Sequence, residues 1–239
     1  MKAALLALTA CGFQPQPDVV IDGAPGDGTM SIIDAAVGPL CQAVPMGAFT
    51  VGTGQLGNPL ADSVANQDLT CMSNEVVVGV QFDMTMAPPP GGWNQRVVVA
   101  THAQCGTIAL SADGLMHTTK TEVVSSPIAG CMNWSPVMMT MPAMCPDGDV
   151  LIAMSGNEAT KNTNMHSLFN SVSLSCAPLD FHGMVTAPPV RLKMMDSGTF
   201  MDQSQSAICP TGMAVTGFTI YQACGDDGLK LQCTPTACM

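Results

Sequence analysis

The residues that offer the most chemistry in this 239-residue sequence carry sulfur: it has 11 cysteines and 20 methionines. Cysteines can pair as disulfides, bind metals as thiolates or act as nucleophiles. The sequence contains no CxxC spacing, the common signature of zinc sites and redox centres. Apart from Cys11 the cysteines number ten, and an even number in an exported chain favours five disulfides over a metal cluster.

Methionines cluster in the segment Met138-Met139-Thr140-Met141 and at Met144. Thioether sulfur suits Cu(I), so this run is a candidate site for a soft metal. Methionine also fills irregular gaps in a protein core. Alternation along a strand would send Met139 and Met141 to one face and Met138 to the other, which would split the cluster. We therefore favour core packing, predict no metal and no cofactor, and keep Cu(I) binding as an alternative.

Signatures of catalysis are weak throughout the sequence. Gly52–Gly57 formally fits a dinucleotide-binding fingerprint, but Asn58-Pro59 follows where a phosphate-binding helix should begin. The four histidines lack metalloprotease spacing, and no Gly-x-Ser-x-Gly elbow occurs. We expect His102 and His166 to be ordinary polar residues on or beside strands. The prediction is a protein that is not an enzyme.

Two acidic clusters could bind ligands. Adjacent residues on a strand point to opposite faces, so Asp226 and Asp227 cannot form the facing carboxylate pair of a glycosidase. In a turn they would accept backbone N–H bonds, and at a ligand site they would accept hydrogen bonds from sugar hydroxyls. The cluster over 22–27 lacks the spacing and terminal glutamate of a calcium loop, which favours a solvated spacer.

The N-terminus predicts export and lipidation. Lys2 precedes a short apolar run, and Leu8-Thr9-Ala10-Cys11 resembles a bacterial lipobox, in which the cysteine is lipidated after cleavage before it. A truncated ordinary signal peptide is the alternative. We expect a signal peptide over 1–10 and a tether rich in acidic residues, Pro and Gly over 11–39, followed by a folded domain over 40–239. The predicted location is the bacterial cell envelope, at the outer membrane, on its periplasmic or outer side.

Charge and hydropathy argue against nucleic-acid binding and against a membrane-spanning helix. Only 10% of residues are charged and the net charge is −11, so binding nucleic acid through phosphate neutralisation is excluded. The uncharged stretches 38–61 and 125–146 are interrupted by Gly, Pro, Asn or Ser, so neither predicts a membrane-spanning helix. The expected membrane contact is the N-terminal lipid alone.

An internal repeat predicts the fold class. Three stretches open with a cysteine and a β-rich segment, at Cys71, Cys145 and Cys209, and each closes with a second strand that ends on a cysteine, at Cys105, Cys176 or Cys233. Short alternating segments and frequent turn residues indicate an all-β domain. The repeat assigns the disulfides Cys71–Cys105, Cys145–Cys176 and Cys209–Cys233. Extended segments precede the three repeats: 49–51 before the first, 108–110 and 137–138 before the second, and 190–192 before the third. They give three units of about four strands.

The repeat resembles that of vitelline membrane outer layer protein I. The resemblance is carried by Cys209–Phe218, by Gly225–Cys233 and by Ser167–Cys176. It covers about residues 40 to 239 and implies a β-prism of three four-stranded Greek-key sheets with pseudo-threefold symmetry. The first repeat departs from the pattern, because Val99 stands where the others have Asn or Asp.

The implied prism also suggests partners for the last four cysteines. If opening strands start at one end of the prism, Cys41 and Cys238 lie near that end and would join the termini of the domain. Cys131 and Cys224 would then pair near the hairpin tips.

The same implied architecture gathers candidate ligand residues at the tips of the hairpins. They are an aromatic and amide set with two carboxylates: Trp93, Asn164, Tyr221, Asp226 and Asp227. Aromatic faces beside hydrogen-bonding groups suit a glycan. The aromatic content of 4% argues against a dedicated lectin, so a structural envelope protein without a small ligand stands beside carbohydrate binding as an alternative.

Overall fold

The computed structural model describes residues 41–57, 65–87, 95–128, 137, 139–159, 168–186, 190–195, 203–222 and 226–239. Within these ranges the chain folds as β-strands and turns, and contains no helix that could cross a membrane. The predicted signal peptide, Cys11 and the predicted tether lie outside the described residues.

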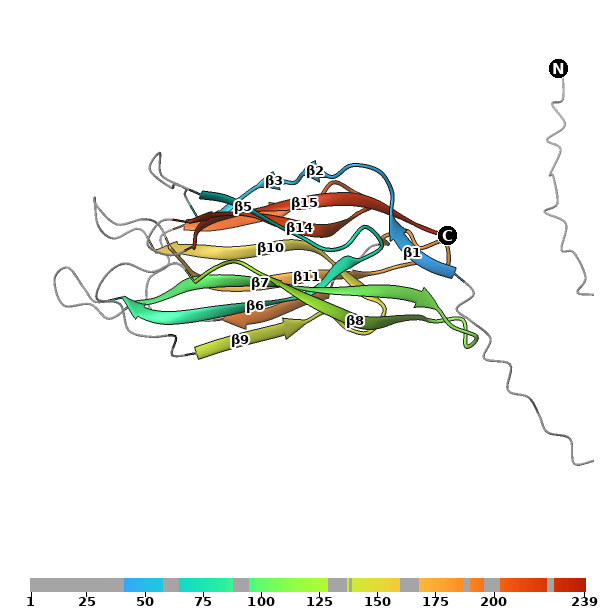
Figure 1. The fold of residues 1–239 in the computed structure, drawn as a ribbon, viewed down its shortest axis with the longest axis horizontal. Helices are drawn as coiled ribbons and strands as arrows, with labels where there is room; N and C mark the ends of the chain where they lie inside the picture. Colours follow the sequence, from blue (N-terminus) through green and yellow to red (C-terminus); the bar gives the residue numbers. More distant parts are fainter. Residues whose placement is uncertain are drawn as a thin grey trace, which may run out of the picture. The chain divides into compact units, whose positions relative to one another are not determined.

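Figure 1 shows the strands of the described residues. They are β1 (Cys41–Pro45), β2 (Thr50–Val51), β3 (Thr53–Gly54), β4 (Leu56–Gly57), β5 (Ala65–Thr70), β6 (Val76–Ala87), β7 (Gln95–Leu110), β8 (Met116–Ser125), β9 (Met139–Met144), β10 (Asp149–Ala159), β11 (Leu168–Pro178), β12 (Val190–Met195), β13 (Gln203–Ile208), β14 (Met213–Gln222) and β15 (Asp226–Cys238).

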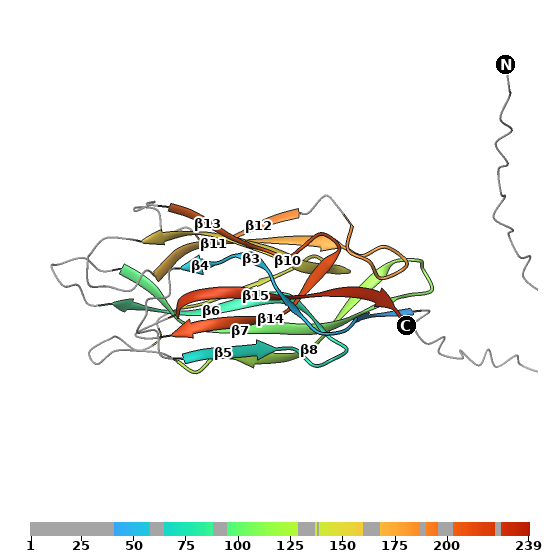
Figure 2. The ribbon, with the colours of Figure 1, turned by 90° about the horizontal axis from the view of Figure 1, so that it is seen from above.

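Each repeat contributes one long hairpin, which we call repeat 1 (β6 and β7), repeat 2 (β10 and β11) and repeat 3 (β14 and β15). The sheet of repeat 1 has the order β9-β6-β7-β8, and that of repeat 2 has the order β13-β10-β11-β12. Both follow the Greek-key order, in which the fourth strand returns beside the first. In repeat 3, β5 flanks β14, while the short β2 and β4 flank β15. The expected all-β prism, built from three Greek-key sheets, is the observed architecture (Figure 2). β3 adds a fifth strand beside β13, and β1 joins the sheets of repeats 1 and 3 into one.

The outer strands belong to different hairpins from those that the sequence suggests. β12 pairs with β11 of repeat 2, although its residues precede repeat 3 in the chain. Likewise β9 pairs with β6, and β2 pairs with β15. The expectation that each extended segment joins the hairpin that follows it is therefore wrong. The sheet of repeat 3 is completed instead by strands from the start of the domain.

Each hairpin carries a bulge on its opening strand, at equivalent positions. The extra residues are Val78, Ile152 and Thr216, each one residue past the partner of a closing cysteine. The carbonyl of each accepts a hydrogen bond from the cysteine that opens another repeat: Cys145 N–H to Val78 O at 2.8 Å, Cys209 N–H to Ile152 O at 2.9 Å and Cys71 N–H to Thr216 O at 3.0 Å. These three bonds close a ring that links each repeat to the next.

A second set of bulges lies on the closing strands. Tyr221 pairs with Gly228 while Gln222 pairs with Asp226, so Asp227 is the extra residue in β15. Asn170 and Val99 occupy the same place in repeats 2 and 1. The Asn or Asp of the sequence repeat therefore marks a β-bulge, and Asp227 lies within a strand rather than in a turn.

The core draws on all three repeats. Phe82, Leu151, Met154, Phe218 and Ile220 are each at most 1% exposed and belong to one apolar cluster. Burial of one such side chain contributes about 1.5–3 kcal/mol. The core fixes which residues of each strand face outward, because alternate residues point to opposite faces.

Four of the five expected disulfides are present in the structure. The pairs Cys71–Cys105, Cys145–Cys176 and Cys209–Cys233 each span a Cα–Cα distance of 5.6 Å. Cys41–Cys238 joins the ends of the domain across 5.4 Å, beside the backbone bond from Met239 N–H to Gln42 O. Since β1 pairs with both β15 and β7, it connects the sheets of repeats 3 and 1. The expected pair Cys131–Cys224 lies outside the described residues.

Candidate functional site

The residues expected at the hairpin tips are described only in part. Tyr221 lies on β14, opposite Gly228 of β15 and Asn66 of β5. Asp226 and Asp227 begin β15, one residue along the hairpin from Tyr221. The structure thus brings the backbones of these three residues together at one end of repeat 3. Trp93 and Asn164 lie outside the described residues.

Tyr221 belongs to a polar surface on the outer side of the repeat 3 sheet. The alternate residues Ile220 and Leu229 are buried in the core, so Tyr221 and Lys230 face outward. The Lys230 Nζ lies 5.3 Å from the centroid of the Tyr221 ring, within the range of a cation–π contact. We call this surface the repeat 3 face and define it by Asp68, Thr70, Thr219, Tyr221, Lys230 and Gln232.

The repeat 3 face holds one carboxylate in a fixed orientation. Asp68 Oδ1 accepts hydrogen bonds from Thr219 Oγ1 at 2.7 Å and from Gln232 Nε2 at 2.8 Å. Gln232 Oε1 in turn accepts a bond from Thr70 Oγ1 at 2.8 Å. Among the described residues none donates to Asp68 Oδ2, and Asp68 is exposed. The Asp68 carboxylate is therefore held in one orientation by side chains of β14 and β15.

Gly217 makes this support possible. Gln232 is fully buried, and its side chain crosses β14 at Gly217 to reach β5. A Cβ at position 217 would lie 2.6 Å from Gln232 Oε1 and 2.5 Å from the Leu69 carbonyl oxygen. Glycine is required here because of this close approach.

The equivalent face of repeat 1 carries different chemistry. By register Asp83 stands where repeat 3 has Tyr221, and His102 stands where it has Lys230. His102 Nε2 lies 3.0 Å from Asp83 Oδ2, and its Nδ1 lies 2.7 Å from Ser125 Oγ. Thr140 Oγ1 donates to Asp83 Oδ1 at 2.9 Å. The four side chains link strands β9, β6, β7 and β8 in one row.

This row has the composition of a hydrolase triad but not its arrangement. In a serine hydrolase the serine contacts Nε2 of the histidine and the carboxylate contacts Nδ1, whereas His102 makes the two contacts the other way round. The expectation that His102 is a polar neighbour on a strand fits its place on β7. His166 lies outside the described residues.

Repeat 1 has no acid at the place that Asp68 holds in repeat 3. Gln104 is the equivalent of Gln232, but Pro142 and Met144 replace Asp68 and Thr70 on the adjoining strand. Gln104 is buried, and no described residue bonds to its Oε1. The amide that orients an acid in repeat 3 therefore has no such partner in repeat 1.

A third polar cluster lies where the turn before β8 meets the opening turn of repeat 2. His117 Nδ1 lies 2.7 Å from Asp147 Oδ2, and its Nε2 lies 2.9 Å from Asp113 Oδ2. The N–H of Leu115 donates to Asp113 Oδ1, and that of Thr118 donates to Asp147 Oδ1. With both ring nitrogens donating to carboxylates, this arrangement holds a protonated imidazole rather than a metal ion.

Hydrogen bonds shift the pKa values of this cluster. The bonds to Asp113 and then Asp147 raise the pKa of His117 above its ordinary value. The pKa of Asp113 is lowered first by the Leu115 N–H and then by His117, and that of Asp147 first by the Thr118 N–H and then by His117. Burial, followed by the charge of Asp147, raises the pKa of Asp149.

The methionine run is split between core and surface. Met141 lies opposite Phe82 and packs against the core, whereas Met144 lies opposite Gly79 and is 37% exposed. Met139 pairs with Met84 in the backbone register, and Met138 lies outside the described residues. The position of Met141 agrees with core filling, and Cu(I) binding stays an untested alternative.

Comparisons with known proteins give a distant structural likeness. No known protein family matches the sequence, and no curated protein matches it. Calystegia sepium agglutinin has a TM-score of 0.47 at 12% identity, covering 80% of this chain and 99% of its own. Malaysian banana lectin has a TM-score of 0.42 at 12% identity, covering 79% and 99%. A mannose-specific jacalin-related lectin from Morus nigra has a TM-score of 0.40 at 10% identity, covering 79% and 96%.

A likeness this distant transfers no ligand and no site residue to this chain. The resemblance to vitelline membrane outer layer protein I also stays a prediction, since no family match supports it.

Sequence reasoning missed most of the repeat 3 face. Asp68 lies on β5, which is far from Thr219 and Gln232 in the chain and meets them only through the sheet of repeat 3. Lys230 lies in the predicted closing strand, but nothing in the sequence showed that it reaches Tyr221.

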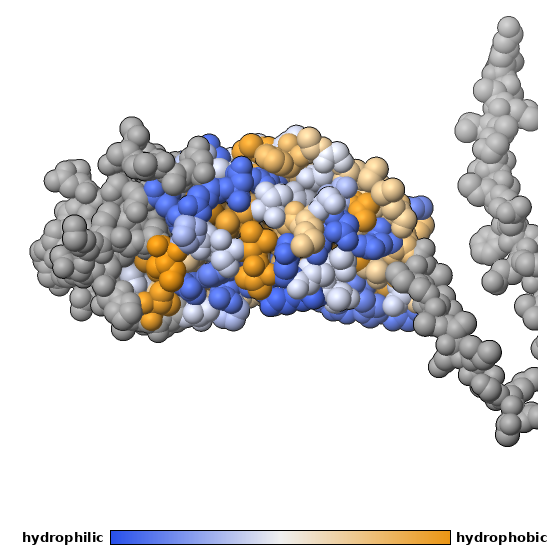
Figure 3. Space-filling view, in the orientation of Figure 1, coloured by the Kyte–Doolittle hydropathy of each residue, from blue (hydrophilic) through white to orange (hydrophobic). Residues whose placement is uncertain are grey.

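On the side drawn in Figure 3, hydrophilic and hydrophobic residues are interspersed over the described domain.

Proposed function

We propose that this β-prism domain is a non-enzymatic carbohydrate-binding module and that the repeat 3 face is its ligand site. The observation that carries the proposal is the orientation of Asp68 by Thr219 and Gln232, which leaves its second oxygen without a donor among the described residues. A fixed carboxylate is well suited to accept hydrogen bonds from sugar hydroxyls, because no side-chain freedom is lost on binding.

The neighbours of Asp68 supply the other contacts that a sugar needs. Thr219 lies opposite Asp68, and Tyr221 lies two residues further on the same outer face. Asp68 and Tyr221 are therefore diagonal neighbours across two strands, and such residues lie about 7–8 Å apart. Tyr221 offers an apolar ring with a polar tip, and Lys230 offers an ammonium donor beside it. The proposed site also includes the sequence-predicted Asp226 and Asp227 at the adjoining end of the hairpin.

A glycan array on the full chain tests this function. We expect binding to at least one glycan class, lost in Asp68→Asn and in Tyr221→Ala. The matched control is Asp83→Asn, because Asp83 holds the place of Tyr221 on repeat 1. If Trp93→Ala loses glycan binding while Asp68→Asn still binds, the ligand site lies at the hairpin tips instead. Silence across all glycans would favour the alternative of a structural envelope protein.

The lipid anchor is the second part of the proposal and rests on the Leu8–Cys11 motif. Only a thiol at position 11 can carry a thioether-linked lipid, so Cys11→Ser should release the protein from bacterial membranes. The domain should still fold, which disulfide mapping of the released protein would check. Retention of the variant in the membrane fraction would contradict the lipid anchor at Cys11.

A further inference from the structure

Two glutamates meet beside the disulfide of repeat 1. Glu75 precedes β6 and is only 4% exposed, while Glu122 lies on β8 and is partly buried. One carboxylate oxygen of each residue and the Sγ of Cys105 lie within 4.8 Å of one another. Because Cys105 is bonded to Cys71, its sulfur is not a thiolate, and the two carboxylates are the charged groups of the cluster.

Within the described ranges, no residue compensates Oε2 of the Glu75 carboxylate. Its Oε2 is buried and has no hydrogen-bond partner among the described residues. The ion pairs within the described part of the chain all involve histidines, and none includes Glu75 or Glu122. A buried carboxylate is costly unless it is paired with a positive charge, and a second carboxylate beside it increases that cost.

A β-bulge brings Glu122 to this place. Gln104 pairs with Val123 and Gly106 pairs with Lys120, so both Thr121 and Glu122 oppose the single residue Cys105. A bulge of this kind changes the direction of a side chain and is common beside functional sites.

In repeat 3, the strand beside the closing cysteine has no bulge at the equivalent position. Thr50 pairs with Cys233 and Val51 pairs with Gln232, with no residue between them. Thr50 Oγ1 lies 3.4 Å from the carbonyl oxygen of Cys233, as Thr121 Oγ1 lies 3.2 Å from that of Cys105. Relative to repeat 3, Glu122 is therefore an inserted residue.

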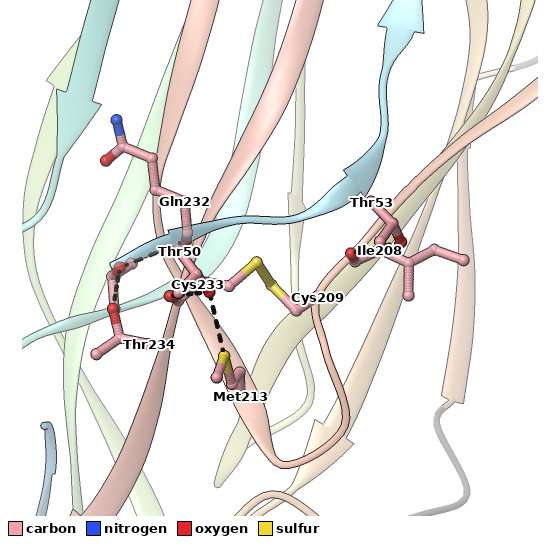
Figure 4. The surroundings of a disulfide bond; sticks show 9 residues. Thr50, Thr53, Ile208, Cys209, Met213, Gln232, Cys233 and Thr234 are labelled. Carbon is pink, nitrogen blue, oxygen red and sulfur yellow. Dashed lines mark hydrogen bonds between the residues drawn. A yellow bond between two sulfur atoms is a disulfide. The ribbon is translucent and has the colours of Figure 1, made fainter. Parts of the chain in front are cut away.

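The partner of Glu122 also departs from the repeat. Glu75 is the fourth residue after Cys71, and Met213 is the fourth residue after Cys209. In repeat 3 the Thr50 Oγ1 lies 3.4 Å from the Met213 sulfur, beside the disulfide (Figure 4). A neutral contact in repeat 3 thus corresponds to two acids in repeat 1, one of them placed by an insertion.

We propose that Glu75 and Glu122 bind a calcium ion. Calcium takes oxygen ligands at about 2.3–2.6 Å, so one ion can bridge two oxygens that lie within 4.8 Å of each other. The partial exposure of Glu122 leaves access for the water ligands that complete its coordination. The ion neutralises the buried Glu75 carboxylate, and a site with two carboxylates belongs to the weak class of extracellular calcium sites, with a Kd of about 10⁻⁴–10⁻³ M.

Calorimetric titration of the full chain with CaCl2 tests the site, together with thermal unfolding at 10 mM CaCl2 and in NaCl of equal ionic strength. We expect one bound ion and a rise in Tm of about 3–6 °C. Glu122→Gln and Glu75→Met, which copies Met213, should lose both signals. The matched control Asp149→Asn changes the equivalent residue of repeat 2 and should keep them.

Three outcomes would overturn the proposal. A wild type whose calorimetric heat and Tm do not respond to calcium would show that the two acids bind no ion. Calcium binding that survives in Glu122→Gln would place the ion elsewhere. Equal responses to NaCl and CaCl2 would show general screening. The glycan array is independent of all three, because none of the repeat 3 face residues takes part.

Discussion

Repeats 1 and 3 share one backbone and differ in almost every polar side chain that it presents. Both have bulges at the same two places, a disulfide at the same bulge and a glutamine that faces a glycine on the opening strand. Repeat 3 uses this frame to hold Asp68 on its outer face. Repeat 1 places an acid beside its disulfide instead. The comparison shows that the core, the bulges and the disulfides specify the prism, while the polar positions are free to take on separate roles.

The two glutamines express this difference most directly. Gln232 bonds to Asp68 and Thr70, whereas no described residue bonds to Gln104 Oε1. A buried polar atom without a partner costs about 1–3 kcal/mol. Gln104 of repeat 1 therefore occupies the position of Gln232 without the acid and the hydroxyl that Gln232 bonds in repeat 3.

The largest expected effect comes from breaking the connection between the two repeats. Cys41–Cys238 closes a loop with a sequence separation of 197, against 24 for Cys209–Cys233. The loop-entropy model gives about 5 kcal/mol for the first and about 3.5 kcal/mol for the second. Urea unfolding of the two double Cys→Ala variants should show the larger loss for the first pair. A smaller loss would mean that strand β1 holds the termini without the disulfide.

Replacing the two glutamines by methionine should have unequal effects on stability. Gln232→Met should lower the free energy of unfolding by about 1–3 kcal/mol, because Asp68 and Thr70 lose their partner. Gln104→Met has the same change in volume and removes an unpaired oxygen, so its effect should be within about 0.5 kcal/mol of zero or stabilising. Equal losses in urea unfolding would show that Gln104 has a partner in solution.

A smaller effect should follow from giving repeat 1 the donor that repeat 3 has. Met144 holds the place of Thr70, so Met144→Thr offers a hydroxyl to Gln104 Oε1. A new neutral hydrogen bond stabilises by about 0.5–1.5 kcal/mol, from which the lost contacts of a partly exposed methionine must be subtracted. Combining this change with Gln104→Met should abolish any gain, which separates the hydrogen bond from other effects of the threonine.

The sequence predicts the hairpins and disulfides better than it predicts the polar residues on the outer faces of the sheets. The cysteine-bounded strands are local, so the internal repeat predicts the pairs Cys71–Cys105, Cys145–Cys176 and Cys209–Cys233. The assignment of outer strands failed because the fourth strand of a Greek key returns beside the first, and β5 has no cysteine motif that marks its partner. Neither Asp68 nor the bulge at Glu122 can be read from the chain, since both depend on which residues oppose each other across strands.

The smallest effect concerns the opening turns. Asp147 of repeat 2 corresponds to Thr211 of repeat 3, two residues after the opening cysteine in each case, so the His117 cluster is also a departure from repeat 3. The raised pKa of His117 adds stability that is complete below about pH 6.5 and is lost as the pH rises through the raised value. The lowered pKa values of Asp113 and Asp147 add stability above about pH 3.8 that is lost as the pH falls through the lowered values. The cluster therefore stabilises most between about pH 4 and 6.5.

We expect the Tm of the wild type to exceed that of His117→Asn by about 1–2 °C at pH 5.5, because the cluster is exposed and screened by solvent. The difference should shrink by pH 8.5, where the imidazole loses its proton. Asp147→Thr, which copies repeat 3, should reduce this pH dependence without removing it, because Asp113 still raises the pKa of His117. It should also lose a constant amount of stability, since the Thr118 N–H loses its acceptor. The control His182→Asn changes an exposed histidine on another turn and should leave the profile unchanged. A wild-type advantage that grows towards pH 8.5 would show that His117 is held neutral, and the cluster would then stabilise this turn by hydrogen bonding alone.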